Sequence, residues 1–255
     1  MNRVAVVTGA SRGIGRATAE LLAQEGWHVA VSDLSADTLG AVLDTIGTKG
    51  GAATALAADL TDAAQVTALA EQAWALRPDH LALVNNAAFL PPEAIAGDTD
   101  LLSTEDWIWD GAWRVNVRGT MSLCRALLPG MLDRGAGAIV NIVSMLGLQP
   151  LPGQQIAYTT SKAAVTMLTR HLAVTYGARG IRCNAVAPGS ILTENQRATY
   201  DDDALAKKLE RYPATRLGTP EDIAAAVAFL LAPAAGFVNG QVLTVDGGVT
   251  TQLAL

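Results

Sequence analysis

The sequence is poor in charge: Asp, Glu, Lys and Arg make up 16% of its 255 residues, against about 25% in typical globular domains. Half of the residues are hydrophobic, so we expect part of the surface to be buried between subunits. Acidic residues outnumber basic ones, and the net charge is −6. Because proteins bind nucleic-acid backbones through basic patches, we expect no nucleic-acid partner.

Cysteine is scarce, and its two copies, Cys124 and Cys183, stand far apart in apolar stretches. There is no CxxC or Cys/His cluster, so we predict no metal site and two reduced, buried thiols. Polar groups interrupt every apolar run before it reaches about 18 residues, so we predict no membrane span. The sequence opens directly on a strand-like run, from which we expect no signal peptide and a cytoplasmic location.

Short apolar or β-branched runs alternate with helical patterns along the whole chain. The runs predict about seven strands, at residues 4–8, 28–33, 53–59, 81–86, 138–144, 181–187 and 241–248. The longer patterns predict helices that include residues 13–24, 35–49, 61–77, 103–134 and 157–179. Ser103 and Asp106 have the spacing of a capping box. The alternation predicts one α/β domain over residues 1–255, a doubly wound parallel sheet (Rossmann fold) with helices on both faces.

A glycine-rich turn, TGASRGIG at residues 8–15, follows the first predicted strand and precedes a helix. Glycines allow a tight turn and close backbone approach, and the free amides of a helix N-terminus attract a pyrophosphate. The spacing G-x-x-x-G-x-G differs from the common dinucleotide fingerprint, but its place between strand and helix favours a dinucleotide site over a structural turn. The residues expected at the phosphates are Gly9, Ser11, Arg12, Gly13, Ile14 and Gly15.

Asp33 ends the second predicted strand, about 20 residues after the glycines, where an acid can hold the adenosine ribose hydroxyls. Its carboxylate would repel a 2′-phosphate, which favours NAD, while Arg12 could meet such a phosphate and favours NADP. Leu34 supplies no basic partner, so we predict NAD. Asp59, with Leu60 beside it, ends the third predicted strand and is a candidate for binding the adenine amino group.

The stretch AYTTSK places Tyr158 and Lys162 four residues apart on a predicted helix. Side chains at i and i+4 share one face, and a nearby cation lowers the pKa of a phenol from its usual value of ~10. Such pairs are also common on ordinary surface helices. Here, however, the helix follows Ser144, and in a parallel sheet the strand ends gather at one edge where ligands bind.

Together, these motifs resemble the short-chain dehydrogenase/reductase family over nearly the whole chain. TGASRGIG is similar to the cofactor turn of that family, and NNA at residues 85–87 to its sheet-stabilising motif. The resemblance covers a catalytic tetrad of Asn116, Ser144, Tyr158 and Lys162. Two departures stand out: Ala88 replaces the usual glycine, and the segment 89–106 is longer than in the plain pattern.

The resemblance implies an enzyme that transfers a hydride between a nicotinamide and a substrate carbon. Tyr158 would be the acid/base, Lys162 would lower its pKa and bind the nicotinamide ribose, Ser144 would bind the substrate oxygen, and Asn116 would anchor a water. It also implies a homotetramer or homodimer. The further residues expected around the cofactor are Asn86, Ala87, Pro188, Gly189, Ile191 and Thr193.

The predicted substrate pocket is mostly apolar, which suggests a hydrophobic or cyclic secondary alcohol or ketone. We expect residues 190–216 to form its lid. The lining expected from the sequence is Ser144, Met145, Leu146, Gln154, Gln155, Tyr158 and Leu192, with Phe89, Leu90 and Tyr212 nearby. Two alternatives remain: an NADPH-dependent reductase of the 3-oxoacyl-thioester type, based on Arg12, and a dinucleotide-binding sensor without turnover.

Overall fold

A computed structural model describes residues 2–151, 153–199, 201–210 and 212–252. Its strands form one parallel sheet in the order β3-β2-β1-β4-β5-β6-β7, which confirms the predicted doubly wound sheet. The strands are β1 (Arg3–Thr8), β2 (His28–Ser32), β3 (Ala52–Ala55), β4 (His80–Asn85), β5 (Gly137–Ile142), β6 (Ile181–Pro188) and β7 (Val242–Val245).

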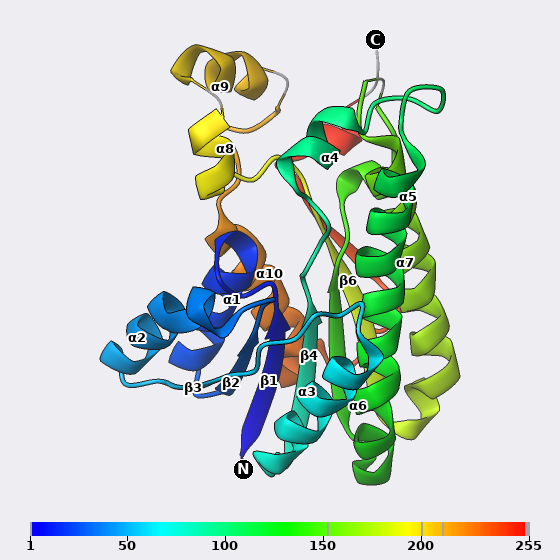
Figure 1. The fold of residues 1–255 in the computed structure, drawn as a ribbon. Helices are drawn as coiled ribbons and strands as arrows, with labels where there is room; N and C mark the ends of the chain where they lie inside the picture. Colours follow the sequence, from blue (N-terminus) through cyan, green and yellow to red (C-terminus); the bar gives the residue numbers. More distant parts are fainter. Residues whose placement is uncertain (1, 152, 200, 211, 253–255) are drawn as a thin grey trace.

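Helices cover both faces of the sheet (Figure 1). One layer contains α1, α2 and α10, and the other contains α3, α6 and α7. The α-helices are α1 (Gly13–Gln24), α2 (Gly40–Thr48), α3 (Ala63–Ala75), α4 (Pro92–Gly97), α5 (Asp106–Ala112), α6 (Thr120–Arg134), α7 (Ile156–Tyr176), α8 (Glu194–Thr199), α9 (Asp202–Leu209) and α10 (Pro220–Leu231). Shorter 3₁₀ or π segments are η1 (Ala36–Leu39), η2 (Trp113–Gly119), η3 (Met145–Gly147), η4 (Gly177–Arg179), η5 (Pro233–Ala235) and η6 (Val249–Thr251).

The packing of the central strand β1 shows why the apolar runs do not alternate between apolar and polar residues. Ala5 and Val7 pack into the core beneath α1 and α10, while Val4 and Val6 pack into the core beneath α3 and α6. All four side chains are fully buried. A strand with cores on both faces is apolar at every position, as expected inside a parallel sheet.

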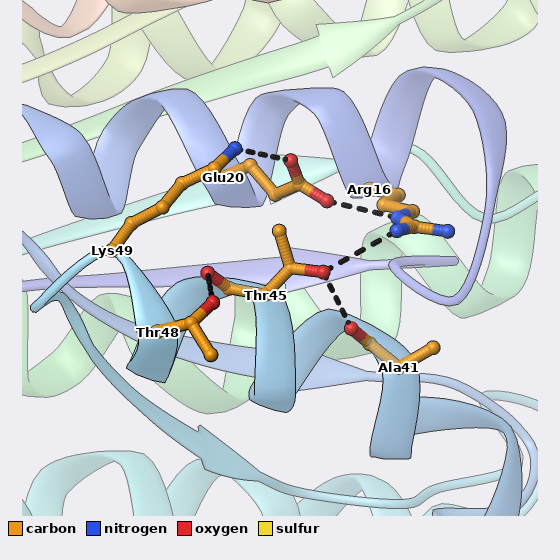
Figure 2. Close-up of polar contacts among 6 residues, drawn as sticks. All are labelled: Arg16, Glu20, Ala41, Thr45, Thr48 and Lys49. Carbon is orange, nitrogen blue, oxygen red and sulfur yellow. Dashed lines mark hydrogen bonds and ion pairs between the residues drawn. The ribbon is translucent and has the colours of Figure 1, made fainter.

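An ion-pair cluster joins α1 to α2 (Figure 2). Glu20 accepts hydrogen bonds from Arg16 at 2.8 Å and from Lys49 at 3.2 Å, and Arg16 also donates to Thr45 Oγ1 at 3.4 Å. The three charged side chains are partly exposed, so each pair contributes little stability alone. The cluster links α2 to α1, while the buried core that the two helices share holds them together.

Three local predictions differ from the structure. Regular pairing in β3 ends at Ala55, although the amide of Leu56 still bonds to Val31 in β2 and that of Ala58 to Asp33, directly after β2. The predicted capping box is wrong: the Ser103 hydroxyl bonds to Asp100, and α5 begins after an N-cap at Glu105. The predicted helix 103–134 is divided by η2 into α5 and α6.

Candidate active site

The glycine turn between β1 and α1 is shaped to receive a ligand. Gly9 and Gly13 have φ of 63° and 54°, a conformation that favours glycine. A Cβ at Gly15 would collide with the carbonyl oxygen of Gly9. The N-cap residue Arg12 makes no side-chain cap, so the first amides of α1 are open to a phosphate. These features fit the pyrophosphate of a dinucleotide.

Asp33 lies directly beside this turn. Its Oδ2 accepts from the amide of Ser11 at 3.1 Å, and its Oδ1 accepts from the amide of Leu34 at 2.8 Å. Each carboxylate oxygen has a second lone pair, so Asp33 can also accept from ribose hydroxyls. The side chain of Leu34 is 73% exposed. Asp33, predicted to bind the adenosine ribose, therefore lies next to the glycine turn.

Asp59 has a local role in the described structure. Its Oδ1 accepts from the amide of Thr61 at 2.8 Å, within the turn that leads to α3. Leu60 is buried and would contact a Cβ placed on Gly119. The expected contact of Asp59 with an adenine amino group stays a prediction.

The residues that follow β4, the neighbour of β1 on its other side, bond to the same turn. Asn86 donates from Nδ2 to the carbonyl oxygens of Thr8 and Gly9, at 2.9 and 3.1 Å. The amide of Ala87 donates to Thr8 Oγ1 at 3.1 Å. These bonds fix the turn against β4, which explains the need for a short polar side chain at position 86.

The loop after β6 lies over α1. Pro188 ends β6, and the amide of Gly189 donates to Val245 at 3.0 Å. Ile191 forms an isolated bridge with Gly218. The Thr193 methyl lies 3.3 Å from the Cβ position of Gly13. The predicted nicotinamide-side residues thus come to the same edge as the glycine turn.

Ser144, Tyr158 and Lys162 come together from β5 and α7. The Ser144 side chain lies near enough to the Tyr158 hydroxyl to lower the pKa of the phenol by hydrogen bonding. Lys162 Nζ lies 5.7 Å from the centroid of the Tyr158 ring and donates to the carbonyl oxygen of Ile142 at 2.8 Å. Ser144 Oγ accepts from the amide of Leu146 at 3.2 Å, which leaves its O–H able to donate.

Burial disfavours the charged forms of Tyr158 and Lys162, the two α7 side chains at this site. It raises the pKa of Tyr158 to about 12, and the bond with Ser144 offsets part of this rise. Burial also lowers the pKa of Lys162 to about 8. Lys162 is thus not the main influence on the Tyr158 pKa in this structure, and its expected activating effect depends on the ammonium keeping its proton.

Asn116 lies in the π-helical segment η2 and joins three elements. Its Oδ1 accepts from the amide of Phe89 at 2.7 Å, and its Nδ2 donates to Ser161 Oγ at 2.9 Å. Ser161 in turn donates to the carbonyl oxygen of Tyr158 at 2.6 Å. The Asn116 side chain therefore supports the Tyr158 backbone, and a water held by this residue would bind its main chain.

A small cavity adjoins the Tyr158 side chain. Four residues predicted at or near the pocket, Phe89, Leu90, Gln155 and Tyr158, line it, whereas the walls from α4 and α5 were not predicted. The complete lining is Phe89, Leu90, Ala94, Ile95, Asp98, Ile108, Ala112, Gln155 and Tyr158. Proline at the start of α4 and the extra length of segment 89–106 were the available signals for this wall.

The remaining residues predicted for the pocket lie outside the lining of this cavity. Met145 and Leu146 begin η3, directly after Ser144. Gln154 is exposed, and Leu192 is half-buried with its amide bonded to Gly218. Tyr212 bonds through its hydroxyl to Ser190, at 2.6 Å to Oγ and 3.0 Å to the amide. That residue holds the loop after β6.

Comparisons with known proteins agree with this geometry. The model of a family described as enoyl-(acyl carrier protein) reductase matches residues 9–250. The chain is 39% identical to 2-(S)-hydroxypropyl-CoM dehydrogenase 3 of Xanthobacter autotrophicus, over 98% of this chain and 97% of the relative. The chain belongs to the short-chain dehydrogenase/reductase family. The protein described here, referred to below as this dehydrogenase, is an NAD(P)-dependent oxidoreductase that acts on CH–OH groups.

Two further similarities extend over the same length. Galactitol 2-dehydrogenase (L-tagatose-forming) of Cereibacter sphaeroides is 41% identical to this dehydrogenase, covering 96% of this chain and 94% of the relative. A gluconate 5-dehydrogenase from Burkholderia cenocepacia, solved with NADP and tartrate, has a TM-score of 0.87 at 31% identity. That alignment covers 99% of this chain and 96% of the solved one. The family predicted from the motifs is confirmed.

The described residues also bear on two other kinds of site. No helix there is long and apolar enough to cross a membrane. Nor do the described residues bring together three or more His, Cys, Asp or Glu side chains that could hold a metal ion.

Proposed function

We propose that this protein is an NAD-dependent dehydrogenase of apolar secondary alcohols, acting also on the corresponding ketones. The observation that carries the proposal is the approach of Ser144 and Lys162 to Tyr158, beside a cavity of about 10 Å³ with mainly apolar walls. Such a volume holds about one water molecule, so these walls mark one side of the substrate site and not its full extent. The one carboxylate in that wall, Asp98, is occupied by backbone amides. An apolar substrate is therefore the better match.

The chain's own residues supply the proton chemistry. Tyr158 exchanges a proton with the substrate oxygen, and Ser144 donates a hydrogen bond to that oxygen as its charge develops. Charged Lys162 stabilises the phenolate form of Tyr158. The glycine turn and the loop after β6 would hold a nicotinamide cofactor, which would supply or accept the hydride.

The preference for NAD rests on Asp33. Its carboxylate faces the glycine turn and would repel a 2′-phosphate, while Leu34 adds no positive charge. The gluconate dehydrogenase solved with NADP shows that relatives of this fold accept the phosphorylated cofactor. An NADPH-dependent reductase of 3-oxoacyl thioesters is the second candidate, supported by Arg12 at the N-cap of α1.

We further propose that α8 and α9 form a lid over the substrate. Both helices lie at the carboxyl end of the sheet, the same end as α4 (Figure 1). Tyr212, which bonds to Ser190, anchors the C-terminal side of this segment. Helices in such a position can exclude water from the reaction.

We also propose a cytoplasmic homotetramer or homodimer. Along η2 and α7, Trp113, Met167 and Val174 are 44%, 51% and 86% exposed. Near α10, Phe229 is 47% exposed and Phe237 is fully exposed. Exposed apolar groups of this size are typical of subunit interfaces. Both cysteines are free and buried, which suits a reducing compartment.

The test is turnover with NAD⁺ and NADP⁺ over a panel of aliphatic and cyclic secondary alcohols and polyols, followed by absorbance of the reduced nicotinamide. Tyr158→Phe should abolish turnover, whereas Tyr176→Phe, at the other end of the same helix, should leave it unchanged. Preference for polyols would contradict the apolar substrate. Cofactor binding with no turnover of any alcohol or ketone, unaffected by Tyr158→Phe, would indicate a sensor.

A further inference from the structure

A buried carboxylate holds the first turn of the helix that carries Tyr158. Asp98 follows α4 and is only 6% exposed. Its Oδ1 accepts from the amide of Ala157 and its Oδ2 from the amide of Tyr158, both at 2.9 Å. One of its two bonds thus goes directly to the residue that bears the reacting hydroxyl.

These bonds meet a need of α7. Its N-cap residue, Gln155, makes no side-chain cap, and the first amides of a helix have no acceptor within the helix. The positive end of the helix dipole also stabilises the negative charge of the carboxylate. Among the residues that the structure describes, no cation forms an ion pair with Asp98. Its charge is therefore compensated by the amides of α7, which fixes carboxylate and helix relative to each other.

The position of the carboxylate is itself fixed by packing. The amide of Asp98 donates to the carbonyl oxygen of Ala94 at 2.8 Å, closing the end of α4. Ala94 packs in one buried cluster with Ile108, Ala112 and Ala157. The acceptor is thus attached to a segment that already contacts α7 and lines the cavity beside Tyr158.

Tyr158 lies in the first helical turn, where helices fray most readily. Its hydroxyl is at the far end of the side chain, so a small rotation of this turn displaces the hydroxyl further than the backbone. Asn116 and Ser161 hold the carbonyl side of Tyr158, while Asp98 holds the amide side. The two supports together restrict the backbone from both directions.

We propose that Asp98 is a positioning residue for Tyr158: by binding the amides of Ala157 and Tyr158 it keeps the hydroxyl aligned with Ser144 and the substrate. Asp98 itself takes no part in proton transfer. This inference rests on the proposed function, since alignment matters only if Tyr158 performs the acid/base step. It also gives the long segment 89–106 a role in turnover in addition to shaping the pocket.

The test compares two carboxylates that each accept from two amides in the first turn of a helix, Asp98 from a distant segment and Asp62 as the N-cap residue of α3 itself. Asp62 accepts from the amides of Ala64 and Gln65 at the start of α3, and serves as the control. Asp98→Asn keeps the shape but loses one acceptor, and should lower kcat by about 10- to 100-fold, the cost expected for a small misplacement of a catalytic group. The dissociation constant of reduced cofactor should not change. Asp98→Glu, which keeps charge and both acceptors, should restore much of the activity.

Two readouts separate alignment from general stability. The primary isotope effect with a deuterated alcohol should increase in Asp98→Asn and not in Asp62→Asn, because the chemical step alone becomes slower. Hydrogen exchange of a peptide covering residues 155–165 should become faster in Asp98→Asn, whether or not a substrate is known. Unchanged exchange there, or an equal loss of kcat in Asp62→Asn, would overturn the proposal. Lack of turnover in the wild-type protein would instead count against the proposed function.

Discussion

Lys162 approaches Tyr158 from within the protein, with its Nζ 5.7 Å from the ring centroid and its proton donated to the carbonyl oxygen of Ile142. Removal from water raises the pKa of the phenol to about 12 and lowers the pKa of the ammonium to about 8. The two shifts have one cause, because burial disfavours the charged form of each group. The charge on Lys162 is therefore the element of this site most sensitive to mild alkali.

A pH profile of ketone reduction tests this relationship. Tyr158 keeps its proton at neutral pH and can donate it, but the phenolate formed needs a charged Lys162 beside it. We expect kcat/KM to be level below about pH 8 and to fall above it, as Lys162 loses its proton. Lys162→Met should reduce kcat/KM by about 100-fold or more and remove the alkaline fall. A fall that persists in the variant belongs to another group.

The cofactor preference can be changed at the end of β2. Asp33→Ser removes the charge that would repel a 2′-phosphate, so kcat/KM with NADP⁺ should rise relative to NAD⁺ by about 10-fold or more, as expected for an unfavourable charge contact. Asp37→Ser, an exposed acid in η1, is the control and should leave the ratio unchanged. An Asp33→Ser protein that still rejects NADP⁺ would show that the selection lies elsewhere.

Two glycines distinguish a ligand cradle from an ordinary helix start. Gly15→Ala should abolish cofactor binding, measured by fluorescence of the reduced nicotinamide, because the new methyl would collide with the carbonyl of Gly9. A Cβ on Gly40, at the start of α2, meets nothing within 4 Å. Gly40→Ala should therefore bind cofactor normally and gain up to about 1 kcal/mol of stability. Normal binding by Gly15→Ala would refute the assignment of this turn.

A buried amide pair stabilises the sheet beneath the site. Asn141 accepts from Asn85 Nδ2 at 2.8 Å and donates to Thr169 Oγ1 at 2.8 Å. Asn141→Ala leaves both partners without these bonds and opens a small cavity, so the free energy of unfolding in urea should fall by about 2–4 kcal/mol. Thr169→Val removes one bond with little change in volume and should cost less. A larger loss in Thr169→Val would mean that packing, rather than the amide pair, dominates.

The fold and the grouping of Ser144, Tyr158 and Lys162 were accessible from sequence because each depends on local pattern. Buried parallel strands such as Val4–Val7 are apolar throughout, and Tyr158 and Lys162 share a face simply through helical spacing. Their position after Ser144 followed from the rule that strand ends of a parallel sheet meet at one edge.

Long-range contacts explain what the sequence did not reveal. The bonds from Asp98 to α7 join residues 59 and 60 positions apart, and no periodicity marks such a pair. Ser103 had the spacing of a helix cap, but its hydroxyl bonds to the Asp100 carboxylate instead of capping α5. The π-segment at Asn116 is stabilised by partners at Phe89 and Ser161, distant in sequence, so the helix looked continuous.

The attachment of Asp98 also constrains how this enzyme can be redesigned by recombination. The carboxylate belongs to the segment that shapes the rim, whereas the amides that it binds belong to the catalytic helix. A chimera that takes residues 89–106 from a relative exchanges the acceptor but keeps the donors. With the role proposed for Asp98, specificity and rate would be inherited together at this site, and a grafted rim would need its own acceptor for the amides of Ala157 and Tyr158.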